Sequence, residues 1–256
     1  MCGIFGLITT NELDVVNKNY LKVVNYLFKL SESRGKEASG FITKSEKNID
    51  YYKTPESASK MIKSREYFNH FNKLKMPISI IGHSRLVTNG TQENHDNNQP
   101  IMSQGIVGVH NGIITNVNEL WNTYKMIERE HEIDTEIIFK LLTYYINKSS
   151  SLESAVGLTF SKLLGTASIA SFFSNINKAL IATNNGSLYI AYDTEKKICV
   201  FTSEMFTLRM VTDKILSLKM GKNLEIHKVE PGQAYTIDLS TFDINKFSYA
   251  SKVQRP

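Results

Sequence analysis

The sequence predicts an α+β fold built from layered sheets and helices. Short apolar runs with the period of strands occur in blocks, and segments of helical period are inserted between these blocks without a strict strand–helix alternation. The second half has the pattern of an antiparallel meander, because Asn184-Asn185-Gly186 separates two apolar runs and Pro231-Gly232 precedes another. No glycine-rich phosphate loop of the dinucleotide or P-loop kind interrupts this pattern.

The elements follow from this periodicity in chain order. The apolar runs predict strands at 3–8, 40–43, 78–83, 105–110, 166–173, 179–183, 188–192, 198–202 and 234–238. Helical spacing predicts helices at 15–30, 136–146 and 152–164. In the first of these helices Val16, Tyr20 and Val23 fall on one face, which is expected to pack on the sheet.

The composition is that of one large globular domain. The chain has 256 residues, of which 41% are hydrophobic and 21% charged. The net charge of +5 is spread along the chain without a basic stripe, which argues against nucleic-acid binding. Neither a leader pattern nor a long apolar run is present, so no membrane partner and a cytoplasmic location are expected. The histidines show no metal-ligand spacing, and we expect no metal and no cofactor.

Cys2 is the residue with the clearest chemistry. Removal of Met1 would place a thiol and the α-amino group of the chain on one residue. Because such an amine has a pKa of about 7.7–8.0 and a free thiol one of about 8.5, the amine can accept the thiol proton near neutral pH. On position alone, however, a structural cysteine at the start of a buried strand is the simpler interpretation. Cys199, inside a predicted strand, is expected to be a buried structural thiol.

The pattern along the whole chain favours the catalytic interpretation of Cys2. Met1-Cys2-Gly3-Ile4-Phe5-Gly6 resembles the opening of the class II glutamine amidotransferases, the N-terminal nucleophile group that includes glucosamine-6-phosphate synthase and glutamine phosphoribosylpyrophosphate amidotransferase. Further segments resemble that family in the same order: Ser33-Arg34-Gly35-Lys36-Glu37-Ala38-Ser39-Gly40, Gly82-His83-Ser84-Arg85-Leu86-Val87-Thr88-Asn89-Gly90, Val109-His110-Asn111-Gly112-Ile113-Ile114, Asp134-Thr135-Glu136-Ile137-Ile138 and Pro231-Gly232-Gln233. Each motif is weak alone, but their joint order makes chance agreement improbable.

The resemblance implies a fold and an activity. The fold would be the four-layer αββα sandwich of N-terminal nucleophile hydrolases, with a glutaminase domain at 1–239. The polar segment 240–256 would be a C-terminal extension or linker. The activity would be release of ammonia from L-glutamine through a Cys2 thioester.

The resemblance also assigns the site residues. The Asn111 side chain and the Gly112 backbone N–H would form the oxyanion hole. Free glutamine carries a carboxylate and an ammonium group, for which Arg85 and Asp134 are the expected partners, with Thr88 beside Arg85. Arg34 and Gly35 would support the architecture around the nucleophile.

Simpler interpretations stand beside these roles. Asn111-Gly112 has the composition of a hairpin turn after a strand, and Asp134 has the position of a helix N-cap. Arg85 fits a solvated loop charge. His83 and His110 lie at predicted strand ends, where hydrogen-bonded structural roles are expected.

The departures from the family concern the partner more than the chemistry. Leu86 stands where relatives carry Trp or Tyr in a loop that closes over glutamine, Asn89 replaces a common His, and Glu37 replaces a common Asp. Because no acceptor domain follows in this sequence, either ammonia is expected to pass to a separate synthetase or transferase subunit, or the sequence is a fragment of a longer protein. An N-terminal nucleophile amidase for another amide and a catalytically silent glutamine-sensing module are the alternatives.

Overall fold

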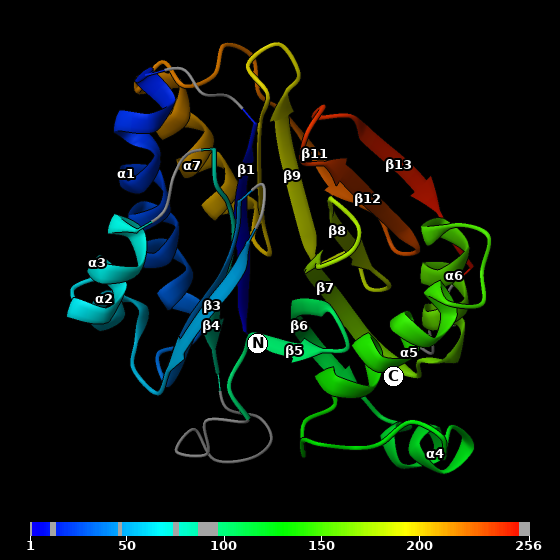
Figure 1. Ribbon diagram of the computed structural model, residues 1–256. Coiled ribbons are helices and arrows are strands. Elements are labelled where there is room, and N and C mark those ends of the chain that lie inside the picture. Colours follow the sequence, from blue (N-terminus) through cyan, green and yellow to red (C-terminus); the bar gives the residue numbers. More distant parts are fainter. Residues whose placement is uncertain (1, 11–13, 46–47, 74–76, 87–96, 251–256) are drawn as a thin grey trace.

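The computed structural model describes residues 2–10, 14–45, 48–73, 77–86 and 97–250. In these ranges, two antiparallel sheets stack face to face and helices cover both outer faces (Figure 1). The first sheet has the strand order β11-β9-β10-β1-β4-β2-β3, and the second has the order β13-β12-β8-β7-β6-β5. The predicted αββα sandwich is therefore confirmed.

The elements have the following bounds. The first sheet contains β1 (Gly3–Thr9), β2 (Ala38–Lys44), β3 (Ile49–Thr54), β4 (Ser79–Arg85), β9 (Leu188–Asp193), β10 (Ile198–Thr202) and β11 (Glu225–Val229). The second contains β5 (Ile101–Ser103), β6 (Ile106–Ile114), β7 (Gly165–Phe173), β8 (Lys178–Thr183), β12 (Gln233–Asp238) and β13 (Ile244–Ser248). The helices are α1 (Asp14–Ser31), α2 (Ala58–Met61), α3 (Arg65–Asn72), α4 (Val117–Thr123), α5 (Thr135–Ile146), α6 (Leu152–Lys162) and α7 (Met205–Ser217), with a short 3-10 turn, η1, at Glu32–Arg34.

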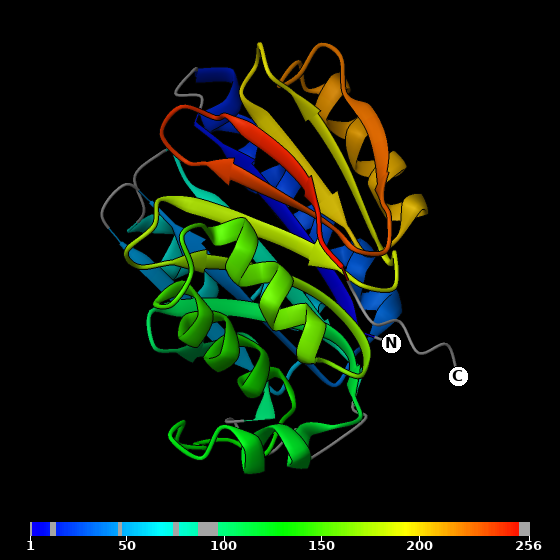
Figure 2. The same ribbon diagram turned by 90° about the vertical axis from the view of Figure 1, so that its right-hand side faces the viewer.

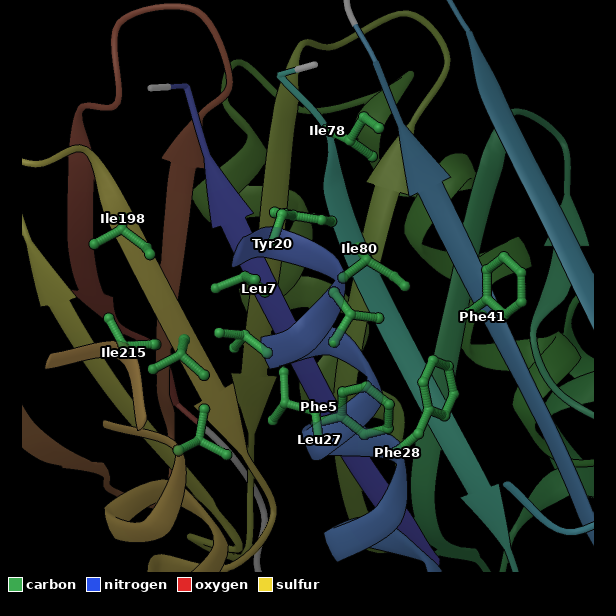
Figure 3. Close-up of a cluster of buried hydrophobic side chains, with 14 of the residues drawn as sticks. Phe5, Leu7, Tyr20, Leu27, Phe28, Phe41, Ile78, Ile80, Ile198 and Ile215 are labelled. Carbon is green, nitrogen blue, oxygen red and sulfur yellow. The ribbon is translucent and has the colours of Figure 1, made fainter. Parts of the chain in front are cut away.

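Alternation along β1 explains why the layers form. Phe5 and Leu7 point to the helical side, where they meet α1 and α7, as the close-up of this core in Figure 3 shows. Ile4 and Ile8 point the other way, into the core between the two sheets. A third core lies between the second sheet and the pair α5 and α6, which face the viewer in Figure 2. Three buried cores between four layers hold the domain together.

The predicted elements are all present, and the structure adds four strands, the helix α7, the short helices α2, α3 and α4, and the turn η1. β3, β5, β11 and β13 are short or carry polar residues at alternating positions, so their apolar signal is weak. The helix α7 has a stronger signal, since Leu208, Val211 and Ile215 share its buried face. This helix was therefore predictable from the spacing of its apolar residues.

The segment after residue 239 contributes to the sandwich. Residues Ile244–Ser248 form β13, which pairs antiparallel with β12 at the edge of the second sheet. Polar composition is typical of edge strands as well as of linkers, which explains why this segment looked like an extension. The domain boundary at residue 239 stays a prediction. None of the helices in the described ranges is both long and apolar enough to cross a membrane.

Candidate active site

The first sheet brings Cys2 beside Arg85. β1 and β4 run antiparallel with Gly3 opposite Ser84, so the residue before β1 meets the last residue of β4. The Cys2 thiol lies 3.5 Å from the backbone carbonyl oxygen of Leu86, to which it can donate a hydrogen bond. Arg85 is only 5% exposed, and its Nη1 donates to Asn98 Oδ1 at 2.6 Å. Arg85 is therefore a buried, oriented cation, and its interpretation as a solvated loop charge is wrong.

The surroundings of Cys2 determine its protonation. Burial raises the pKa of the Cys2 thiol, and the positive charges of Arg85 and Arg34 act in the opposite direction without cancelling the effect. The resting thiol is consequently neutral at physiological pH. A nucleophilic role for Cys2 therefore requires a base that removes the proton during attack.

Gly35 fixes the backbone that carries Arg85. A Cβ atom at Gly35 would lie 2.2 Å from both the carbonyl carbon and the oxygen of Arg85, so only glycine allows this approach. The backbone N–H of Glu37 then donates to the Arg85 carbonyl at 3.3 Å. The neighbouring Arg34 binds the Glu204 carboxylate with Nη1 and Oε1 3.0 Å apart, which ties this segment to the start of α7. These contacts are those of supporting residues, although the role assigned to them stays a prediction.

Asn111 and Gly112 come from the second sheet. β6 continues to Ile114, so the Asn-Gly pair lies within a strand, and its interpretation as a hairpin turn is wrong. Pairing with β7 along this stretch explains the difference, because Asn111 lies opposite Ser168 and Gly112 opposite Ala167. Alternation from Val107 and Val109, which lie in the core between the sheets, directs Asn111 toward the first sheet.

Gly112 requires its missing side chain. Its φ is +151°, and a Cβ atom there would lie 1.9 Å from the carbonyl oxygen of Thr166. Asn111 is 4% exposed, and within the described part of the chain its side-chain amide makes no hydrogen bond. The amide of Asn111 therefore has donors that are not committed to the fold, next to a backbone that can approach a substrate closely.

Asp134 faces β6 instead of capping α5. It occupies the N-cap position of α5, yet its side chain makes no cap hydrogen bond. Its Oδ2 accepts from the backbone N–H of Ile114 at 2.9 Å, and its Oδ1 lies 3.6 Å from Nδ1 of His110. Burial alone would raise the pKa of this carboxyl, but His110 and the Ile114 N–H outweigh burial and lower it. Asp134 is thus an ionised carboxylate at neutral pH.

A hydrogen-bond network that the sequence did not reveal holds this side of the site. Gln99 Nε2 donates to the His110 carbonyl at 2.9 Å and to Thr135 Oγ1 at 3.2 Å, while Gln99 Oε1 accepts from the His110 N–H. The ring Nδ1 of His110 lies 3.3 Å from Thr135 Oγ1. His110 is hydrogen-bonded, as expected. No local signal marks Gln99, because its partners are separated from it by 11 and 36 residues.

His83 differs from His110. It is fully buried in β4, and among the described residues neither of its ring nitrogens has a partner in good hydrogen-bond geometry. The His110 backbone interacts with the ring outside that geometry, so a hydrogen-bonded structural role for His83 stays a prediction. Burial, with smaller contributions from Arg85 and His110, lowers the pKa of His83 to about 3, so the ring is neutral at physiological pH.

Four of the predicted site residues, Cys2, Arg85, Gly112 and Asp134, line one narrow cavity, and Asn111 is not among the lining residues. Cys2 and Arg85 line it from the first sheet. Gly112 lines it from β6 of the second sheet, together with Gln99 before β5 and Asp134 before α5. Arg34 and Gly35 border an adjoining hollow behind Leu86. Thr88 and Asn89 lie outside the described residues. The cavity thus combines a thiol, a guanidinium, a carboxylate and a strained glycine backbone within the same small space.

Comparison with known proteins identifies the family that the sequence motifs resemble. A family model described as a glutamine amidotransferase domain matches residues 83–210. The chain is 30% identical over 251 residues to an amidophosphoribosyltransferase of Methanocaldococcus jannaschii, covering 91% of this chain and 50% of the relative. It is 25% identical over 263 residues to a glutamine–fructose-6-phosphate aminotransferase (isomerizing) of Halalkalibacterium halodurans, covering 97% of this chain and 41% of that one.

A solved structure shares the fold. A glutamine phosphoribosylpyrophosphate amidotransferase from B. subtilis, in complex with ADP and GMP, aligns with 99% of this chain at a TM-score of 0.68 and 19% identity. The alignment covers 50% of that chain. The protein described here therefore spans about half the length of the relatives it matches.

Proposed function

The chain belongs to the class II glutamine amidotransferases, a family of enzymes, and on that premise we propose that it hydrolyses L-glutamine to glutamate and ammonia. The observation that carries the proposal is the single cavity lined by Cys2, Arg85, Gly112 and Asp134. Its groups match the two ends of glutamine. A guanidinium and an ionised carboxylate suit the α-carboxylate and α-ammonium groups, and a thiol lies within the same cavity.

The reaction begins with proton transfer from the thiol. After removal of Met1, the α-amine of Cys2 takes this proton as sulfur attacks the carbon of the side-chain amide. The amide oxygen becomes an oxyanion, which accepts hydrogen bonds from the Asn111 side chain and the Gly112 N–H. The amine then returns the proton to the leaving nitrogen, and the carbon–nitrogen bond breaks. Ammonia departs, and the glutamyl group remains bound to Cys2 as a thioester.

Water completes the cycle. With the amine as base, water attacks the thioester carbonyl, the carbon–sulfur bond breaks and glutamate is released with the Cys2 thiol restored. The same donors of the oxyanion hole serve this second tetrahedral intermediate. Arg85, Asp134 and Thr88 hold the unreactive end of glutamine throughout, so that both attacks occur at a positioned carbon.

A product assay tests the proposal. Purified protein with glutamine should yield glutamate and ammonia in equal amounts, and this turnover should be absent when Cys2 is replaced. Hydrolysis of a different amide, or glutamine binding without turnover, would replace the proposal by an amidase or a glutamine-sensing module. Intact mass of the active fraction should show that Met1 is absent, because an acylated Cys2 nitrogen cannot accept a proton. Full activity in protein that retains Met1 would exclude the mechanism.

We further propose that ammonia passes to an acceptor on a synthetase or transferase, in another chain or in a domain beyond this sequence. Ammonia released into neutral water is largely protonated and is then a poor nucleophile, so delivery to a sheltered acceptor site is advantageous. Copurification from the native host, followed by glutaminase assays with and without the recovered partner and its acceptor, tests this. Stimulated hydrolysis is expected. An unchanged, full rate in isolated protein would indicate a freestanding glutaminase. The cytoplasmic location stays a prediction.

A further inference from the structure

A second polar cavity lies at the opposite end of the sandwich from the cavity that contains Cys2. It is lined by Thr10, Lys44 and Ser79 from the first sheet and by Asn177 and Ser240 from the loops that bound β8 and β12. We call these five residues the distal pocket. Its volume is about 260 Å³, close to the lower limit of roughly 300 Å³ for small-molecule sites.

The strands explain why polar groups converge there. Ile8, Ile42 and Ile81 point into the core between the sheets. Thr10, Lys44 and Ser79 lie two residues further along the same strands, beyond the last apolar position at this end, and therefore point to the same side. The core between the sheets thus ends in a ring of polar side chains instead of closing with apolar ones.

Several polar groups of the distal pocket lack partners in the described part of the chain, although Asn177 Nδ2 donates to Ser240 Oγ at 2.6 Å. Lys44 is 7% exposed, and among the described residues its ammonium forms no ion pair and no hydrogen bond. Thr10 Oγ1 and Asn177 Oδ1 are buried without a hydrogen-bond partner in the same part of the chain. Burial of polar groups is unfavourable unless they are paired, so these three groups are available to hydrogen-bond a ligand in the cavity.

The carboxylate next to the turn that carries Ser240 is already engaged by backbone N–H groups. Asp238, at the end of β12, accepts hydrogen bonds from the backbone N–H groups of Ser240 and Thr241 at 2.9 and 3.0 Å. Its carboxylate therefore holds the turn that carries Ser240, and no ion pair joins it to Lys44 within the described residues. Burial lowers the pKa of Lys44, which is the direction expected for an ammonium without a counter-ion.

We propose that the distal pocket binds a small phosphate, either inorganic phosphate or the phosphate group of a small phosphomonoester. Lys44 supplies the positive charge, and the hydroxyls of Thr10 and Ser79 donate to phosphate oxygens. Asn177 Oδ1 accepts from a P–O–H group or from a hydroxyl of the ester. The site is distinct from the glutamine cavity, since Cys2 and Thr10 flank β1 and lie eight residues apart, which is about 26 Å at roughly 3.3 Å per residue.

Calorimetric titration with inorganic phosphate and, separately, with glycerol 3-phosphate tests the proposal. Wild-type protein should bind at least one of them at a single site, and Lys44→Met should weaken this binding at least about tenfold, because the methionine keeps the stem and removes the charge. The matched control is Lys222→Met, which removes the same charge from an exposed lysine 3.9 Å from Glu195 and should change the affinity less than about twofold.

Two further variants keep the test decisive. Thr10→Val removes only the unpaired hydroxyl and should weaken binding by a smaller factor, whereas Lys44→Arg should retain most of it. Tighter binding of the ester identifies a phosphomonoester site, and equal or weaker binding identifies inorganic phosphate. Binding that is unchanged in folded Lys44→Met and Thr10→Val proteins, or absent in wild type at millimolar phosphate, would overturn the proposal. Circular dichroism shows whether each variant is folded.

Discussion

The two ends of the sandwich differ in whether their polar side chains are hydrogen-bonded within the protein. At the glutamine end, Gln99, His110 and Thr135 satisfy one another in a buried network beside Asp134. At the distal end, the Lys44 ammonium, Thr10 Oγ1 and Asn177 Oδ1 have no partner among the described residues. β1 and β4 of the first sheet reach both ends, whereas the second sheet contributes β6 at the glutamine end and the loops next to β8 and β12 at the distal end.

This difference indicates two ways of preparing a site. A reaction that develops charge needs donors fixed in advance, and the network around His110 fixes the backbone of β6 next to Asn111 and Gly112. A site that only binds can leave its polar groups open, because the ligand supplies their partners on arrival. Changes at the glutamine end should therefore affect turnover, and equivalent changes at the distal end should not.

The largest difference is expected between the two cysteines. Cys2→Ala should reduce glutamine turnover by more than about 10⁴-fold, because the nucleophile is lost, while circular dichroism remains native. A glutamine-mimicking electrophile should label Cys2 alone, because Cys199 is fully buried in β10 and burial raises the pKa of its thiol. Mass spectrometry locates the label. Labelling confined to Cys199 would contradict the assignment of Cys2 as the nucleophile.

The next effect compares two asparagines at opposite ends. Asn111→Ala should lower kcat by about a hundredfold or more with little change in KM, because it removes a donor to the oxyanion. Asn177→Ala, the same substitution in the distal pocket, should leave both constants of glutamine hydrolysis at wild-type values. Steady-state kinetics decide between them. An Asn111→Ala enzyme with normal kcat would remove this residue from the oxyanion hole.

Gly105 and Gly112 lie near the two ends of β6 and both have a positive φ, so the same substitution can be compared at the two positions. A Cβ atom at Gly112 would lie 1.9 Å from the Thr166 carbonyl, whereas at Gly105, with φ +85°, the nearest atom is 3.8 Å away. Gly112→Ala should therefore cost roughly 1–3 kcal/mol more free energy of unfolding than Gly105→Ala, and should also reduce kcat at least about tenfold. Urea titration and kinetics measure the two effects. Equal losses in both variants would mean that backbone strain alone, and not the close approach at Gly112, is responsible.

Two buried carboxylates separate binding from stability. Asp134→Asn should raise KM for glutamine by roughly tenfold, since it removes a charge facing the substrate ammonium but keeps an oxygen for the Ile114 N–H. Asp193 accepts from the backbone N–H groups of Lys196, Lys222 and Asn223 near the far end of the first sheet. Asp193→Asn should lower thermal stability and leave KM unchanged. A normal KM in Asp134→Asn would assign Asp134 to structure.

The last comparison concerns a pH dependence of stability caused by His83. Its folded pKa of about 3 lies below the ordinary value of about 6.5, so between these values the unfolded chain binds a proton that the folded chain does not. Wild-type stability should fall as pH falls through this window, by at most about 1.4 kcal/mol per pH unit from this group. His83→Leu should lack that contribution, and His227→Leu, at an exposed position, should keep it. Denaturant titrations from pH 7 to 4 compare the slopes, and identical slopes in His83→Leu and wild type would contradict the assignment.

The chemistry at the start of the chain could be predicted from the sequence because it resides in one residue. Cys2 carries both the nucleophile and, after cleavage, its base, so no knowledge of the fold is needed to see the possibility. The strands and helices could likewise be predicted where side chains repeat with a local period, as in β1 and α1. Motif order along the chain then pointed to Arg85, Asn111, Gly112 and Asp134.

Only the tertiary structure decided how these residues are used. Pairing of β6 with β7 made Asn111-Gly112 part of a strand instead of a turn, and contact with β6 drew Asp134 away from capping α5. The partnership of Gln99 with His110 and the convergence around Lys44 depend on sheet register and on how the layers stack. Period and composition are local properties of a sequence, whereas the neighbours of a buried polar group come from segments far apart in the chain, and their positions follow from the packing of the whole domain.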